Sequence, residues 1–314
     1  MMHGEPRTHL FPAFGTSVEL LQWGTSERDA EELSAAVMAR AERWERLFSR
    51  FRPESELCRV NRGSGQWESV SSDFFRVVAD ALEGYIATGG RFDPAILTTL
   101  ERAGYDRRFV ATAGNVAVPM DEGIDSDVRN GTMLDIELDE SASAIRLPVG
   151  LRIDLGGIAK GAFVDSVGDL MRGCSGVMLN AGGDIRAWGY PGADDFWRIG
   201  VEHPGDLERD IAELELHAGP SVAVATSSTR TRTWLAGVER QNHLIDPRER
   251  RPVPWSTPSV TAVARTVTDA EIQAKSVLIA ISRGEPVPYT NADFVLVAYE
   301  DGRYETITPY ANVA

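Results

Sequence analysis

The spacing of apolar residues near the N-terminus predicts a strand followed by two amphipathic helices. Residues 16–23 (TSVELLQW) alternate loosely between polar and apolar side chains, which is typical of a strand. A long helix is expected after Ser26, which caps it, with Asp29 three residues on as a partial capping box. A second helix begins at Asp73 and is expected to end at the glycine pair 89–90. Each helix is expected to bury its apolar face.

The middle of the chain has weaker periodicity and more glycine. The segment FSRFRPESELCRVNRGSG (48–65) contains Pro and Gly with little periodicity, so we expect an ordered loop there. A helix is expected to open at residues 156–157, which are both glycine, and residues 177–180 predict a strand that leads into a tight glycine turn at 181–184. That turn is either a hairpin or a ligand-binding loop, and the pattern favours the hairpin.

The last third predicts mainly antiparallel strands with one helix, at about 269–281. The expected strands are Phe196 to Glu202, Ile211 to His217, Val222 to Thr226, Ser259 to Ala264, Phe294 to Tyr299 and Tyr304 to Thr308. Strands that alternate with helices early and cluster late indicate an α+β fold rather than a doubly wound sheet. We expect residues 1–314 to form a single domain, with any second subdomain intertwined with the first.

Composition and charge exclude several classes of protein. The chain has 314 residues, 43% of them hydrophobic, which rules out a disordered chain, a collagen-like chain and a disulfide scaffold. The formal net charge of −15 argues against a nucleic-acid partner or an anionic membrane surface. We find no targeting segment and no run of about 20 apolar residues that would anchor the chain in a membrane. The two cysteines lie in unrelated segments, so we expect a cytoplasmic protein.

The basic residues are very unevenly divided between the two types. Of 32 Lys plus Arg residues only Lys160 and Lys275 are lysine, and the other 30 are arginine. A codon bias that replaces lysine with arginine wherever either will serve explains this division. The two remaining lysines are therefore worth locating.

One glycine-rich segment has the features of an anion site. Asp154 to Asp165 reads DLGGIAKGAFVD, so glycines precede a helix and Lys160 falls in its first turn. A helix N-terminus favours an anion and disfavours a cation, and a bound phosphate would resolve that conflict. The segment matches neither a dinucleotide-binding fingerprint nor a phosphate-binding P-loop. The alternative is an ordinary glycine turn followed by a surface lysine.

Two shorter motifs also carry candidate chemistry. Arg91, Phe92 and Asp93 follow a glycine pair, and the carboxylate either binds a ribose or adenine edge or serves as a solvated cap. His243 stands in a short extended run, NHLIDP, where it either contacts phosphate, acts as an acid or base, or is a satisfied structural group.

Taken together and in order, these blocks resemble the ApbE-type FAD:protein FMN transferases. The matching blocks are AFGT (13–16), FSRFRPESELCRVN (48–61), GRFDP (90–94), DLGGIAKG with Asp165 (154–165), NAGGDIRAWG (180–189), ATSS (225–228), HLIDP (243–247) and VTAVA…TDAEIQAK (260–275). The resemblance implies a T-fold-like α+β architecture with mixed or antiparallel sheets and flanking helices. It also implies cleavage of FAD, transfer of FMN to a Thr or Ser hydroxyl of an acceptor flavoprotein, release of AMP, and magnesium at the phosphates.

The resemblance also assigns roles to residues of this chain. His243 and Lys275 are the catalytic candidates, and Gly157 and Glu271 are the metal candidates. The residues implied in FAD binding are Phe14, Phe51, Arg91, Phe92, Asp93, Asp154, Lys160, Leu244 and Ile245.

The sequence departs from the family where magnesium is expected. The family's run is commonly A-D-x-x-[AD]-T, and residues 270–275 read AEIQAK, so Glu271 replaces the Asp and Lys275 replaces the Thr. Magnesium requires oxygen ligands, which an ammonium cannot supply. Three interpretations remain open: magnesium binds through Glu271 and Gly157 while Lys275 turns to phosphate, the ammonium replaces the metal charge, or Lys275 points to solvent. For function, the alternatives to a transferase are an FAD pyrophosphatase and a non-catalytic FAD-binding protein.

Overall fold

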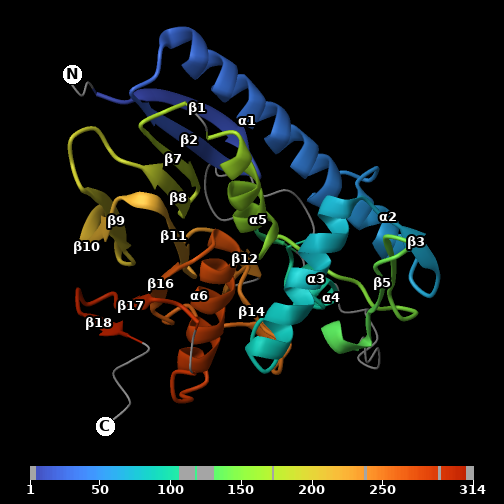
Figure 1. Cartoon of the computed structure of the whole chain (residues 1–314). Coiled ribbons are helices and arrows are strands. Elements are labelled where there is room, and N and C mark those ends of the chain that lie inside the picture. The colour runs from blue at the N-terminus through green and yellow to red at the C-terminus, as the bar shows by residue number, and fades with distance from the viewer. Residues whose placement is uncertain are drawn as a thin grey trace.

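An eight-stranded antiparallel sheet is the centre of the fold in the computed structural model (Figure 1). The structure describes residues 5–105, 117–118, 131–171, 173–236, 239–288 and 291–308. Along the sheet the strands are β1 (Arg7–Ala13), β2 (Thr16–Trp23), β7 (Gly176–Ala181), β8 (Asp184–Gly189), β11 (Gly219–Ser227), β16 (Ser259–Ala264), β17 (Phe294–Ala298) and β18 (Tyr304–Ile307). The predicted α+β class is confirmed, and so is the hairpin, since β7 pairs antiparallel with β8.

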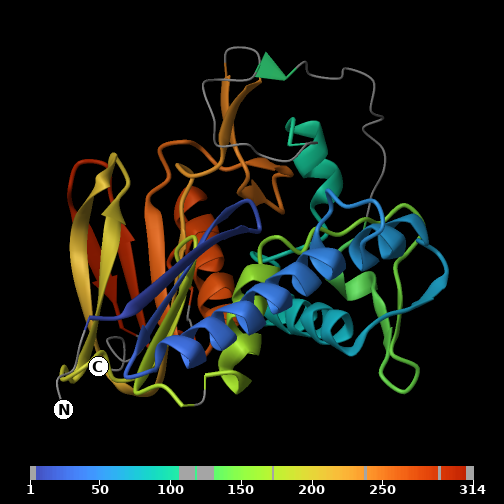
Figure 2. The same cartoon turned by 90° about the horizontal axis from the view of Figure 1, so that it is seen from above.

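Both faces of the sheet are covered near its middle. The helices α1 (Glu27–Phe48), α5 (Ala159–Ser166) and α6 (Val267–Ser282) lie on one side, and the hairpin of β9 (Phe196–His203) and β10 (Asp206–His217) lies on the other (Figure 2). All six residues of β16 are buried as a consequence. Apolar side chains of β9 and β10, such as Ile199 and Leu214, pack against Val224 and Val263 of the sheet. Strands covered on both faces carry nearly continuous apolar runs, as the SVTAVA sequence of β16 does.

A second group of elements lies beside the helical layer. It comprises α2 (Glu56–Arg62), α3 (Ser72–Ala87), α4 (Leu97–Arg102), the 3₁₀ helix η1 (Met133–Asp135) and a small sheet of β3 (Trp67–Ser69), β5 (Glu137–Asp139) and β6 (Ala144–Arg146). The expected loop at 48–65 is wrong, because it contains α2. Ser55 caps this helix by accepting a hydrogen bond from the Cys58 N–H, and Leu57 and Val60 are its buried apolar residues. Two apolar positions on seven residues are too few to show a helical period.

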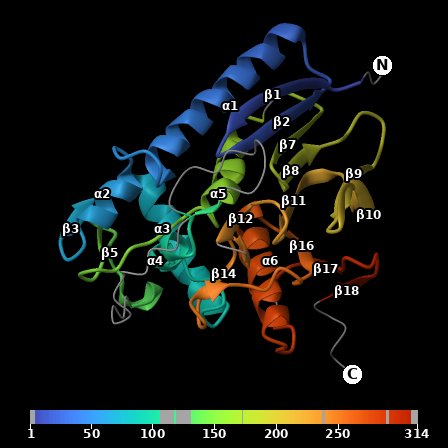
Figure 3. The same cartoon turned by 180° about the vertical axis from the view of Figure 1, so that it is seen from behind.

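Five short strands form two further small sheets. Strands β12 (Thr233–Ala236) and β13 (Glu239–Asn242) form a three-stranded sheet with β4 (Ala117–Val118), and β14 (Ile245–Asp246) pairs with β15 (Arg251–Pro252). Figure 3 shows β14 beside α6, and β15 contacts α4. Within the described part of the chain, no helix has the length and apolar character to cross a membrane.

Candidate functional site

A cavity of about 1000 Å³ opens between the central sheet, the helical layer and the segment around β14. Every residue assigned a role by sequence lines it, although these residues come from segments far apart in the chain. They are Phe14, Phe51, Arg91, Phe92, Asp93, Asp154, Gly157, Lys160, His243, Leu244, Ile245, Glu271 and Lys275. The β7–β8 turn also lines the cavity through Gly182 and Gly183, so the turn is a hairpin that faces the site. The ordered blocks of the sequence therefore converge on one place in the fold.

Two ammonium groups and two carboxylates meet at the floor of this cavity. Lys275 Nζ lies 3.2 Å from Glu271 Oε1, and Lys160 Nζ lies 3.5 Å from the same oxygen. Lys160 also forms a close ion pair with Asp184, which begins β8. Lys160 is thus not a surface lysine, and its charge in the first turn of α5 is balanced by carboxylates of the protein itself. Lys275 does not point to solvent either, since its side chain is 18% exposed and faces Glu271.

Close packing of α5 on α6 positions this cluster. Glu271 and Lys275 are four residues apart on α6 and therefore share one face of that helix. Gly161 lets the helices approach, because a Cβ there would lie 3.0 Å from backbone atoms of Val267 and Thr268. The Gly161 N–H donates to Glu271 Oε2 at 3.0 Å, so the carboxylate takes the anion position at the start of α5.

Burial and neighbouring charges set the ionisation of the cluster. Burial raises the pKa of Glu271, but the ammonium groups of Lys275 and Lys160 outweigh it and bring the pKa below its usual value. Burial lowers the pKa of Lys160 to about 8, with Glu271 acting against it and Arg232 acting in the same direction as burial. Glu271 is therefore ionised at neutral pH, and the cluster is held by opposite charges.

The donor set at this cluster does not fit magnesium. Both oxygens of Glu271 are already engaged, one with two ammonium groups and the other with the Gly161 N–H. The aliphatic end of Lys275 covers Gly157, since a Cβ on Gly157 would lie 3.2 Å from Lys275 Cε. Throughout the described ranges, no three His, Cys, Asp or Glu side chains gather as metal ligands. A divalent ion would also meet two positive charges here.

His243 lies beside the cationic cluster and is neutral. Burial lowers its pKa well below the ordinary value, and the charges of Arg232, Lys275 and Lys160 act in the same direction. Its Nδ1 is buried without a hydrogen-bond partner in the part of the chain described by the structure. The imidazole also has a hydrogen bond with the Arg232 backbone, so one nitrogen is engaged while Nδ1 is unused. A neutral imidazole with an unused nitrogen can accept a proton.

An arginine that the sequence reasoning missed holds Asp154. Arg50 Nε lies 3.0 Å from Asp154 Oδ2, and the Arg50 guanidinium sits 4.3 Å from the ring centres of both Phe51 and Tyr105. Both side chains of the pair are almost fully buried. Arg50 directly precedes Phe51 in the recognised block, and a charge beside an assigned aromatic residue was the available clue. Asp184, which pairs with Lys160 beside the cavity, lies in a recognised block to which the sequence assigned no role at this position. Arg232, in a run whose clustered hydroxyls and arginines suit phosphate contacts or form a polar strand end, also lines the cavity.

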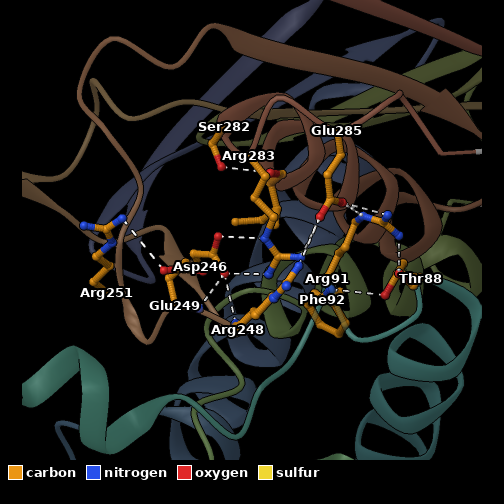
Figure 4. A network of polar contacts seen from close by, with 11 residues as sticks. Thr88, Arg91, Phe92, Asp246, Arg248, Glu249, Arg251, Ser282, Arg283 and Glu285 are labelled. Atoms are coloured by element: carbon orange, nitrogen blue, oxygen red, sulfur yellow. Dashed lines mark hydrogen bonds and ion pairs between the residues drawn. The ribbon is translucent and has the colours of Figure 1, made fainter.

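A network of ion pairs attaches the segment that follows His243 to the C-terminal end of α6 (Figure 4). The Arg283 guanidinium donates to both carboxylate oxygens of Asp246, at 2.8 and 2.5 Å, and Asp246 also accepts from the backbone N–H of Arg248 and Glu249. Glu285 then accepts from Arg91 at 2.9 Å. The charge of Arg91 is therefore used inside the protein, while its backbone leads directly to the cavity residues Phe92 and Asp93.

Asp93 is half-buried and is not a solvated cap. It accepts a hydrogen bond from the Ala95 N–H at 2.8 Å. Burial raises its pKa to about 6, with that hydrogen bond and the charge of Arg250 acting against the increase. A partly buried carboxylate that lines a cavity is suited to accept hydrogen bonds from a ligand.

Fold and cavity together define an α+β protein with a large cavity lined by aromatic, acidic and basic side chains. The chain belongs to the ApbE family, whose sequence profile matches residues 14–284. It is 28% identical to an FAD:protein FMN transferase of Vibrio cholerae over 280 residues, 87% of this chain and 82% of the relative. It is 28% identical to one of Klebsiella pneumoniae over 253 residues, 77% of this chain and 73% of the relative.

Solved structures share the fold. The ApbE protein of Thermotoga maritima superposes with a TM-score of 0.81 at 24% identity, covering 96% of each chain. The flavin transferase ApbE of Vibrio cholerae superposes with a TM-score of 0.74 at 24% identity, covering 98% of each chain. The T-fold-like ApbE architecture expected from the sequence is therefore confirmed.

Proposed function

We propose that this protein is an FAD:protein FMN transferase that moves FMN from FAD to a Thr or Ser hydroxyl of an acceptor flavoprotein and releases AMP. The observation that carries the proposal is the convergence of all thirteen assigned residues on one cavity of about 1000 Å³. Relatives named FAD:protein FMN transferase that span most of the chain support the same activity.

The cavity offers complementary groups to each part of FAD. Phe14, Phe51 and Phe92 supply apolar ring surfaces for the aromatic ring systems, and Leu244 and Ile245 extend this apolar wall. The half-buried Asp93 carboxylate suits the hydroxyls of a ribose or ribityl chain. Asp154 is held by Arg50 and shapes the opposite side. Lys275 supplies positive charge for the pyrophosphate, and Lys160 lines the same part of the cavity beside it.

The transfer step needs a base and charge stabilisation. The acceptor hydroxyl oxygen attacks the phosphorus of the FMN half and forms a new P–O bond. The bond from that phosphorus to the bridging oxygen breaks, and AMP leaves with the bonding electron pair. The neutral imidazole of His243, which lines the cavity, takes the hydroxyl proton. The Lys275 ammonium stabilises the negative charge that develops on the phosphoryl oxygens. No step is assigned to magnesium, because the donors at Glu271 and Gly157 do not fit it.

One incubation tests this function against its alternatives. The protein is mixed with FAD and a candidate FMN-acceptor flavoprotein, and the products are analysed by intact-mass spectrometry and chromatography. An FMN adduct on an acceptor Thr or Ser, with an equal amount of AMP, is expected. Free FMN and AMP without an adduct would instead show an FAD pyrophosphatase, and unchanged FAD bound to the protein would show a non-catalytic binder.

A further inference from the structure

The only two lysines of the chain converge on one buried carboxylate. Both ammonium groups contact Glu271 Oε1, and the Glu271 side chain is 2% exposed. The lysines lie 115 residues apart in sequence and come from different helices, α5 and α6. The remaining basic residues of the cavity are arginines with other partners, such as Arg50 with Asp154 and Arg91 with Glu285.

The two ammonium groups are not equally neutralised. Lys160 pairs closely with Asp184 and also contacts Glu271, so two carboxylates balance it. Lys275 has Glu271 as its carboxylate contact, and Glu271 is shared with Lys160. An ammonium has three N–H donors, and that contact uses one of them. Lys275 lines the cavity and therefore retains charge and donors for an anion there.

We propose that the Lys275 ammonium is the resident cation of this site and neutralises the FAD pyrophosphate in place of a divalent metal ion. The ammonium lies beside Glu271, and the aliphatic end of the same side chain lies over Gly157; these are the two residues through which the family resemblance implies magnesium binding. Glu271 holds the ammonium as a carboxylate holds a metal ion. This inference rests on the proposed function in one respect, namely that FAD is the ligand.

Physical chemistry separates this arrangement from a metal site. An ammonium donates hydrogen bonds and carries one charge, whereas magnesium accepts electron pairs from about six oxygen atoms and binds only as a separate ion. Because the Lys275 side chain is part of the protein, its positive charge is present at the site whether or not free metal ions are in solution. FAD binding should therefore be independent of the free magnesium concentration, and neutralising Lys275 should weaken binding in every buffer.

The test is FAD affinity with and without metal, measured by isothermal titration calorimetry and flavin fluorescence. Full-length protein is titrated with FAD in excess EDTA and again in millimolar MgCl₂. The two dissociation constants should agree within about twofold. The Lys275→Met variant, which keeps an unbranched side chain of nearly the same length without the ammonium, should bind FAD at least about tenfold more weakly in EDTA, because a charge-assisted contact is lost.

The matched control is Arg28→Gln. Arg28 forms an i,i+4 ion pair with Glu32 on the exposed surface of α1, so this variant also removes one positive charge and one helical pair. It should bind FAD like the parent. Thermal denaturation of each variant shows whether Lys275→Met still folds, and the comparison of parent protein in EDTA and MgCl₂ needs no variant.

Each outcome has a distinct meaning. Parent protein that binds FAD only when magnesium is added overturns the inference and leaves the proposed function standing. A folded Lys275→Met variant that binds FAD in EDTA as tightly as the parent also overturns it. Parent protein that binds FAD under neither condition contradicts the proposed function itself, and with it the inference.

Discussion

The ammonium of Lys275 lies 3.2 Å from the carboxylate of Glu271, one turn earlier on α6. This pair occupies the position for which the family resemblance implies a magnesium ion, and Lys160 contacts the same carboxylate oxygen from α5. The codon bias that explains the 30 arginines does not explain why both lysines lie here. The unbranched Lys275 side chain passes over Gly157 and ends in a compact ammonium at Glu271, where a planar guanidinium needs more width.

Replacing Lys275 with arginine tests whether the site requires an ammonium. Lys275→Arg keeps the charge but places a wider group above Gly157, whose Cβ position lies only 3.2 Å from Lys275 Cε. We expect about fivefold to tenfold weaker FAD binding, corresponding to about 1 kcal/mol. Fluorescence titration measures the effect. Affinity equal to that of the parent would mean that the lysine is only a remnant of the codon bias.

Gly157→Ala tests the close approach from the other side. The added Cβ would lie 3.2 Å from Lys275 Cε, press on this side chain and move its ammonium away from Glu271. We expect kcat/KM for FAD to fall about tenfold, since displacements of about 1 Å at a reacting centre are costly. Gly168→Ala is the control, because its Cβ would meet Trp188 at an ordinary 3.6 Å. Equal rates for both variants would show that Lys275 adjusts without loss.

The sequence predicted the strands of the sheet and the residues of the cavity better than it predicted the contacts among those residues. The long helix α1 has clear helical periodicity, and β16 stands out as a short, nearly continuous apolar run. The blocks marked every cavity residue to which a role was assigned. The contacts among Lys160, Asp184 and Glu271 depend on how α5 packs on α6 and β8, which no local pattern reports. Short elements such as α2 were missed because tertiary packing and one cap define them rather than their own periodicity.

The Arg283–Asp246 pair should support both stability and the position of His243. The two side chains are 14% and 6% exposed, and Arg283→Met leaves a buried carboxylate with backbone donors alone. We expect a loss of about 2–3 kcal/mol in the free energy of unfolding, measured by urea denaturation, together with a lower kcat. Arg303→Met removes the exposed pair with Asp301 and should cost less than about 0.5 kcal/mol. Similar losses for both variants would contradict a buried anchoring role.

His243→Gln should separate binding from transfer. Glutamine keeps a polar side chain but cannot take a proton, so we expect kcat to fall about 100-fold to 1000-fold while FAD affinity changes little. His217→Gln, at an exposed residue of β10, serves as the control. Burial lowers the pKa of His243 well below 6.5, so its acid limb in kcat/KM should also lie below that pH. Loss of activity centred at pH 6.5 or above would contradict the role of a buried neutral base.

The Asp93→Asn substitution should raise the stability of the protein at neutral pH and lower its affinity for FAD. Burial raises the pKa of this carboxyl to about 6 from an ordinary 3.8, so the folded protein keeps a proton that the unfolded chain releases between those values. The free energy of unfolding of the parent therefore falls as pH rises from about 4 to about 6 through this group. Asparagine cannot ionise, so Asp93→Asn should be more stable than the parent by about 2 kcal/mol above pH 6 and by little near pH 4. FAD affinity at pH 7.5 should fall, because the variant loses the charged acceptor in the cavity.

Urea denaturation between about pH 4 and pH 7 measures the effect of Asp93→Asn on stability, and fluorescence titration measures its effect on FAD affinity. Asp139→Asn is the control of opposite sign, because hydrogen bonds from Ser141 and Ala142 lower the pKa of Asp139. An Asp93→Asn variant that shows no gain in stability with rising pH would place the carboxylate in solvent rather than in the wall of the cavity.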